Sequence, residues 1–138
     1  MKATIFQIVN AYYALESIGT TTLEVADIAS VLSARRALRP HVEDYESFVA
    51  DAREKFKPAN YDELVEIEQR MNDATDEEKR THSIGVFNYN KTIEDAVMSE
   101  FAENIDVADA MLPIETAAKI AKAKEWTIEQ MNVLSILM

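Results

Sequence analysis

Residues 28–56 have the sequence IASVLSARRALRPHVEDYESFVADAREKF, whose apolar side chains recur three or four residues apart. The recurring positions are Ile28, Val31, Ala34, Leu38, Val42, Tyr45, Val49, Ala52 and Phe56. This spacing places side chains on one face of an α-helix. Pro40 lies inside the stretch, and a proline in a helix interior costs about 3 kcal/mol because it lacks an N–H group. Since the apolar spacing continues through Pro40 without a slip, we expect one long helix that is kinked there.

Shorter helices are expected on both sides of this stretch, over residues 4–17, 60–72, 113–124 and 127–138. In a capping box, a Thr or Asn side chain and a Glu or Gln three residues later bond each other's backbone N–H groups at a helix start. Four pairs fit this pattern: Thr21 with Glu24, Asn60 with Glu63, Thr75 with Glu78, and Thr127 with Gln130. Pro113 suits the first helical position of the segment that it opens. These signals predict a mainly α-helical chain.

The path of residues 73–112 is the part of the chain that the pattern determines least. Residues 84–89 and 105–111 alternate between apolar and polar side chains, with a helical segment between them. Such alternation is typical of a short strand, and for residues 84–89 an extended connector is the alternative. We expect these two pieces to pair as one small two-stranded β ribbon. The length of the chain fits a single, mainly helical domain over residues 1–138.

The composition argues against an enzyme. The chain has two glycines, two histidines and no cysteine in 138 residues. Phosphates and cofactors are usually held in glycine-rich loops, and a nucleophile needs a base within hydrogen-bonding reach. Neither pattern occurs in the sequence, so we expect a non-catalytic protein without a cofactor.

Metal-binding patterns are also missing from the sequence. A di-iron helical bundle needs Glu-x-x-His motifs, whereas Glu78 and His82 are four residues apart. A calcium loop needs a central glycine and spaced carboxylates, which the acidic run over residues 73–78 lacks. We therefore expect no metal site.

The formal net charge is −11, and the excess of carboxylates lies in the middle of the chain. Residues 43–109 carry nineteen acidic and seven basic side chains. Such a field repels nucleic-acid phosphates, so direct binding of DNA or RNA is not expected. No apolar run approaches the roughly 20 residues of a membrane helix, and the N-terminus lacks a secretory signal pattern. We expect a cytoplasmic protein that does not enter membranes.

Three arginines form a local exception to the acidic charge. Arg35, Arg36 and Arg39 lie on adjacent turns of the long helix. They either pair with acidic side chains of the middle region or contact an anion or an acidic partner near Pro40.

Two further groups are candidates for contacts with other proteins. The acidic side chains that a basic partner would meet are Asp73, Asp76, Glu77 and Glu78. The apolar C-terminal side chains that we predict for self-association are Val133, Leu134, Leu137 and Met138. The same apolar end could instead dock into the chain's own core, and the pattern does not separate these alternatives.

Three segments carry a resemblance to a group of viral proteins. They are VADIASVL (25–32), LRPHVEDYESFVADAREKF (38–56) and WTIEQMNVL (126–134), with the acidic middle between the last two. This order is similar to small proteins of unknown function that are encoded by tailed phages and prophages. The resemblance implies a viral origin, a non-enzymatic role in binding a partner, and a location in the host cytoplasm or in the virion.

We therefore expect a non-catalytic protein that binds other proteins as a phage accessory or assembly component and forms a homo-oligomer. One alternative is an acidic inhibitor whose carboxylates imitate nucleic-acid phosphates on a host DNA- or RNA-binding defence protein. A second alternative is a protein that sequesters a small ligand.

Overall fold

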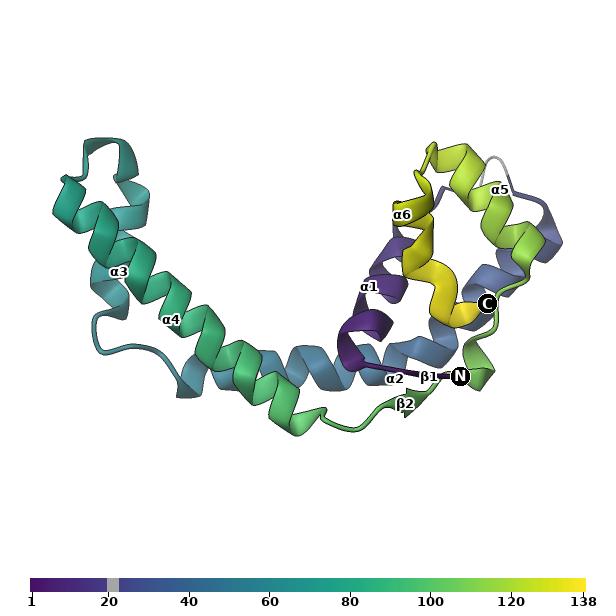
Figure 1. The fold of residues 1–138 in the computed structure, drawn as a ribbon, viewed down its shortest axis with the longest axis horizontal. Helices are drawn as coiled ribbons and strands as arrows, with labels where there is room; N and C mark the ends of the chain where they lie inside the picture. Colours follow the sequence, from purple (N-terminus) through teal and green to yellow (C-terminus); the bar gives the residue numbers. More distant parts are fainter. Residues whose placement is uncertain (20–22) are drawn as a thin grey trace. The chain divides into compact units, whose positions relative to one another are not determined.

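The computed structural model describes residues 1–19 and 23–138 of the chain. The described part is mainly α-helical with one two-stranded antiparallel sheet, which confirms the predicted fold class (Figure 1). The elements in chain order, with η for a 3₁₀ helix, are β1 (Lys2–Ala3), α1 (Ile5–Glu16), α2 (Val25–Lys55), α3 (Tyr61–Gln69), η1 (Met71–Asp73), α4 (Asp76–Glu100), β2 (Ile105–Asp106), η2 (Ala108–Ala110), α5 (Ile114–Lys124), α6 (Ile128–Met131) and η3 (Asn132–Leu137). Within the described ranges, no helix combines the length and the apolar composition that a membrane crossing requires.

The long helix α2 continues from Val25 to Lys55 with Pro40 inside it. This confirms the prediction that the helix does not end at the proline. Leu38 and Val42, on either side of Pro40, are only 1% and 2% exposed. Burial of such side chains stabilises a fold by about 1.5–3 kcal/mol each, which offsets the cost of the proline.

The chain forms two compact units. Residues 1–45 and 101–138 make the first, which we call the terminal unit, and residues 46–100 make the second, the middle unit. α2 begins in the terminal unit and ends in the middle unit. The sequence predicts a single domain from the length of the chain, and its apolar spacing runs through α2 without marking the boundary between the two units.

The core of the terminal unit is built from side chains of both of its segments, residues 1–45 and residues 101–138. The side chains that are no more than 1% exposed include Ile5, Ile8, Leu15, Leu38, Ile120, Leu134 and Leu137. η3 packs on α1, and the backbone N–H of Leu112 donates to the Leu137 carbonyl at 2.7 Å. The helix predicted over residues 127–138 is therefore a short α6 followed by η3, and it docks into the core of its own chain.

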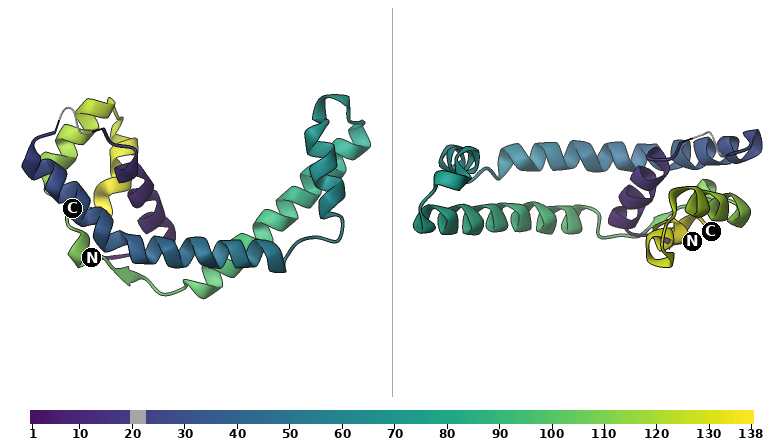
Figure 2. Two further views of the ribbon diagram at one scale, coloured as in Figure 1. Left: turned by 180° about the vertical axis from the view of Figure 1, so that it is seen from behind. Right: turned by 90° about the horizontal axis from the view of Figure 1, so that it is seen from above.

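In the middle unit, α3 packs against α4 (Figure 2). The buried side chains of these two helices are Leu64, Ile67, Ile93 and Val97. Gly85 faces Leu64 of α3, where a Cβ atom would lie 2.7 Å from Cδ1 of that leucine. Glycine at this position therefore permits an approach that any other residue would crowd.

The predicted ribbon between residues 84–89 and 105–111 is wrong. Residues 84–89 lie inside α4, and β2 pairs instead with β1 at the N-terminus, where Ala3 stands opposite Ile105. A short apolar run suits a packed helix as well as a strand, so contact with α3 decides its structure. Gly85 does not interrupt α4, because the absence of a side chain is what allows this contact.

Two of the predicted capping boxes are confirmed. The pairs in which each side chain bonds the other's backbone N–H are Thr75 with Glu78 and Thr127 with Gln130. Asn60 precedes α3 as expected, but its side chain makes no capping hydrogen bond, so that prediction is wrong. Thr21 lies outside the described residues. Pro113 stands one position before the first residue of α5 rather than inside the helix.

Candidate functional site

An open groove of about 440 Å³ lies in the middle unit, between α4 and the segment that joins α2 to α3. Its apolar surface comes from Phe56, Pro58, Ile84 and Tyr89, and its other lining groups are amides, hydroxyls and Gly85. No charged side chain lines it. A surface of this kind can accept an apolar side chain and hydrogen-bond to the backbone or amide groups next to it.

Aromatic contacts hold one side of the groove. The Tyr89 hydroxyl donates a hydrogen bond to the backbone carbonyl of Arg53 near the end of α2. The rings of Tyr61 and Tyr89 meet edge to face with centroids 6.0 Å apart, and the ammonium group of Lys57 lies 4.9 Å from the Tyr61 centroid. These contacts tie the segment before α3 to α4, so the groove has a defined wall.

Beside the groove, α4 exposes three large apolar side chains. Ile84, Phe87 and Met98 are 55%, 66% and 54% exposed, and we call them the α4 stripe. They are three and eleven residues apart, close to one and three turns, so they lie on the same side of the helix. Ile84 also lines the groove, so the stripe begins at the edge of the groove.

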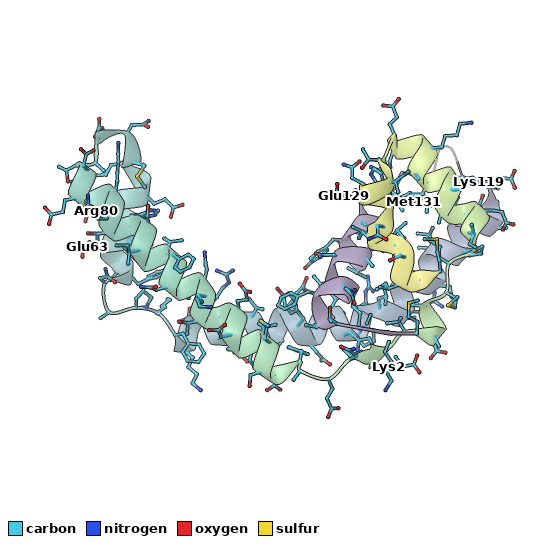
Figure 3. The ribbon with its side chains drawn as sticks, viewed as in Figure 1. Lys2, Glu63, Arg80, Lys119, Glu129 and Met131 are labelled. Atoms are coloured by element: carbon cyan, nitrogen blue, oxygen red, sulfur yellow. The ribbon has the colours of Figure 1, made fainter. Side chains whose placement is uncertain are left out.

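The unit that contains this apolar surface is rich in charged side chains. Residues 46–100 carry fourteen acidic and seven basic side chains. Glu63 on α3 and Arg80 on α4 are both exposed (Figure 3). Between Phe87 and Met98, Lys91 is paired with Asp95 at 3.7 Å. The apolar surface thus belongs to a unit whose formal net charge is negative, although Arg80 and Lys91 lie one turn from Ile84 and Phe87, respectively.

The acidic side chains predicted to meet a partner differ in their surroundings. Asp73 in η1 and Asp76 and Glu77 in the first turn of α4 are exposed. Glu78 is instead engaged, because its carboxylate pairs with the Arg70 guanidinium and accepts the Thr75 backbone N–H at 3.1 Å. The ion pair with Arg70, followed by the bond from Thr75, lowers the pKa of Glu78 to about 2. Glu78 therefore caps α4 rather than presenting a free charge.

The three arginines lie together on α2 in the terminal unit. Arg35, Arg36 and Arg39 line a hollow of about 150 Å³ with Leu32. None of them forms a salt bridge with a carboxylate in the described part of the terminal unit. The Tyr12 hydroxyl, followed by the negative charges of Glu43 and Glu16, raises the pKa of Arg39.

The C-terminal side chains predicted for self-association are mostly core residues. Leu134 and Leu137 have no exposed surface, and Val133 and Met138 are half-buried. The segment is apolar because it completes the core of the terminal unit, where it packs on α1. This corrects the assignment of Leu134 and Leu137 to a surface between copies of the chain.

A buried polar cluster joins α2 to α5 in the terminal unit. Asp27 is 6% exposed, and its carboxylate accepts hydrogen bonds from the Thr116 hydroxyl and the Lys119 ammonium, both at 2.7 Å. Lys119 itself is partly exposed (Figure 3). The bond to Lys119, then the bond to Thr116, lowers the pKa of Asp27, and Asp27 in turn raises the pKa of Lys119. The cluster holds the two helices together. Its charged groups, Asp27 and Lys119, are already bonded to each other.

Sequence reasoning missed this cluster and the groove for different reasons. Asp27 and Lys119 are 92 residues apart, and no local pattern links such positions. The α4 stripe did leave a signal, since Ile84 and Phe87 have helical spacing, but the alternation around Gly85 favoured a strand.

Replacing Asp27 with Asn is expected to lower the melting temperature. It should also make the melting temperature change less as the pH falls through the acid range. A carboxylate with a lowered pKa stabilises the fold fully above its unfolded pKa, about 3.8, and the effect is lost as the pH falls through the folded pKa. The parent protein loses this contribution below about pH 4, whereas the variant has none to lose. Thermal melts followed by circular dichroism across the acid range measure both effects.

The matched control is Asp44→Asn, at an exposed position of the same unit. It should keep the parent's melting temperature and acid dependence. Parallel pH profiles for the parent protein and Asp27→Asn would contradict a stabilising role for the cluster.

Among the described residues, no group of three or more His, Asp or Glu side chains is placed to hold a metal ion. Each ionisable group whose pKa is perturbed has a visible structural partner, as Asp27 and Glu78 illustrate. No protein-family model and no curated protein matches the sequence, and no solved structure matches the fold.

Proposed function

We propose that this is a non-catalytic binding protein whose middle unit docks a segment of another protein on the groove and the α4 stripe. The observation that carries the proposal is the exposure of Ile84 and Phe87 next to an uncharged groove. Exposed apolar side chains that form one continuous patch are typical of interaction sites, whereas scattered ones are not. The two side chains are one helical turn apart and offer a partner adjacent anchor points.

The charges around the patch define the chemistry of the partner. The middle unit has twice as many acidic as basic side chains, and Asp76 and Glu77 in the first turn of α4 are exposed. A complementary segment carries apolar side chains on one face and lysine or arginine beside them. We infer that the partner segment is a basic amphipathic helix. Its apolar side chains would fill the groove, and its basic side chains would meet the carboxylates.

Replacing Phe87 with Asp is expected to weaken the binding of such a segment by about tenfold or more, because interface anchors lose on the order of 2 kcal/mol when removed. The probe is a fluorescently labelled amphipathic peptide of leucine and lysine, and anisotropy measures its binding. Phe87 is 66% exposed, so the substitution should leave the fold intact.

The control is Ile128→Asp, because Ile128 is 91% exposed in the terminal unit. Both variants gain one negative charge, so diffuse attraction of a basic peptide would strengthen in both. Loss of binding in Phe87→Asp alone supports docking on the α4 stripe. Equal binding by the two variants contradicts it.

The same three proteins serve as baits for the natural partner. If the chain has the phage origin that its sequence resemblance implies, the partner is a protein of the virion or of the infected cell. A partner retained by the parent protein and Ile128→Asp, but not by Phe87→Asp, supports the proposal. The alternative function is an acidic inhibitor that imitates nucleic acid. A partner that dissociates equally from all three baits at about 0.5 M salt favours this alternative.

A further inference from the structure

The hollow on α2 brings three like charges together. Arg35, Arg36 and Arg39 line it with Leu32, at the spacing of one helical face. In the described part of the terminal unit, no carboxylate forms a salt bridge with any of the three, although the charges of Glu43 and Glu16 act favourably on Arg39. Three guanidinium groups around one small space repel one another, and an anion placed between them would relieve this repulsion.

Tyr12 on α1 fixes two of these side chains. The Arg35 guanidinium lies over the Tyr12 ring, 5.5 Å from its centroid, and Arg39 Nε lies 3.5 Å from the Tyr12 hydroxyl oxygen. Tyr12 is only 7% exposed, so it is held by the core of the terminal unit. Arg35 and Arg39 are therefore positioned by contacts with Tyr12 before any ligand arrives, which lowers the entropy cost of binding.

We propose that this hollow binds a small phosphorylated ligand, with the phosphate oxygens accepting hydrogen bonds from the three arginines. Guanidinium groups match phosphate oxygens in geometry and form paired hydrogen bonds with them. A phosphate group carries about −1.5 to −2 charges at pH 7, which balances three cations better than a single carboxylate does. The hollow measures about 150 Å³ and has room for a small ionic group rather than a folded domain. This site lies in the terminal unit and is independent of the groove in the middle unit.

Titration calorimetry with inorganic phosphate and pyrophosphate tests the proposal, at constant ionic strength so that general screening is equal. We expect saturable binding of pyrophosphate, with acetate giving none. Arg36→Gln should weaken binding by about tenfold, since it removes a charge-assisted contact. Arg36 is exposed, so its replacement leaves the core untouched. Arg36→Lys keeps the charge but loses the paired donors, and its affinity should fall between those of the parent protein and Arg36→Gln.

Lys122→Gln is the matched control, because it removes one exposed cation of the same unit outside the hollow. It should bind pyrophosphate as the parent protein does. The proposal is overturned if neither phosphate nor pyrophosphate binds saturably, or if Arg36→Gln and Lys122→Gln weaken binding equally. Equal binding of acetate would also overturn it, by showing that the arginines take any anion.

Discussion

Leu134→Asp is expected to unfold the terminal unit. Leu134 has no exposed surface, so the substitution places a carboxylate among apolar side chains without a partner. Removing the buried leucine and burying a charge together cost more than about 4 kcal/mol. Because a whole domain is stable by only about 5–15 kcal/mol, this loss takes a large share of the available stability.

Trp126 is the sole tryptophan of the chain and lies in the terminal unit, so its fluorescence reports on that unit. Urea titrations followed by this fluorescence should show a transition at much lower urea, or none, for Leu134→Asp. The control is Ile128→Asp, at a site six residues earlier that is 91% exposed, and its midpoint should stay close to that of the parent protein.

This experiment also separates the two roles considered for the C-terminal segment. If the parent protein is an oligomer by light scattering, and Leu134→Asp is a monomer with an unchanged urea midpoint, the segment docks on another copy. That result would contradict its place in the core.

A second large effect is expected in the middle unit, where α3 and α4 meet. Leu64→Ala should destabilise this unit by about 2–5 kcal/mol, because Leu64 is 4% exposed and its removal leaves a cavity. Gly85→Ala introduces a Cβ atom 2.7 Å from the same leucine. Helix propensity favours alanine by about 1 kcal/mol, but crowding costs about 1–3 kcal/mol, so we expect a net loss.

The double variant Leu64→Ala with Gly85→Ala tests whether these two residues act on each other. Removing the leucine makes room for the new methyl group. The loss of unfolding free energy in the double variant should therefore be smaller than the sum of the two single losses by at least about 0.5 kcal/mol. Urea titrations followed by far-ultraviolet circular dichroism measure all four proteins. Strictly additive effects would show that Gly85 does not control the approach of the two helices.

The sequence predicted the elements that depend on local contacts. The apolar spacing around Pro40 indicated a continuous α2, since each buried side chain of a helix is set by neighbours three or four residues away. The capping box at Thr127 was equally visible, because both of its hydrogen bonds lie within four residues.

The candidate sites depended on contacts that no local pattern contains. The arginines on α2 were visible as a cluster, but Tyr12, which orients two of them, lies 27 residues from Arg39. The α4 stripe became a surface only when α3 covered the opposite face of α4 and left Phe87 exposed.

Spacing along the chain was therefore sufficient for most helices of this protein, because hydrogen bonds and side-chain faces within a helix repeat every few residues. The exception is residues 84–89 of α4, whose short apolar run also suits a strand. Three features required the folded chain: the division into two units, the pairing of β1 with β2, and the burial of Leu134 and Leu137. Each of these depends on which distant segment removes a side chain or a backbone group from water. Which distant segment does so is decided by the free energy of the whole packed fold, and no short stretch of sequence contains that information.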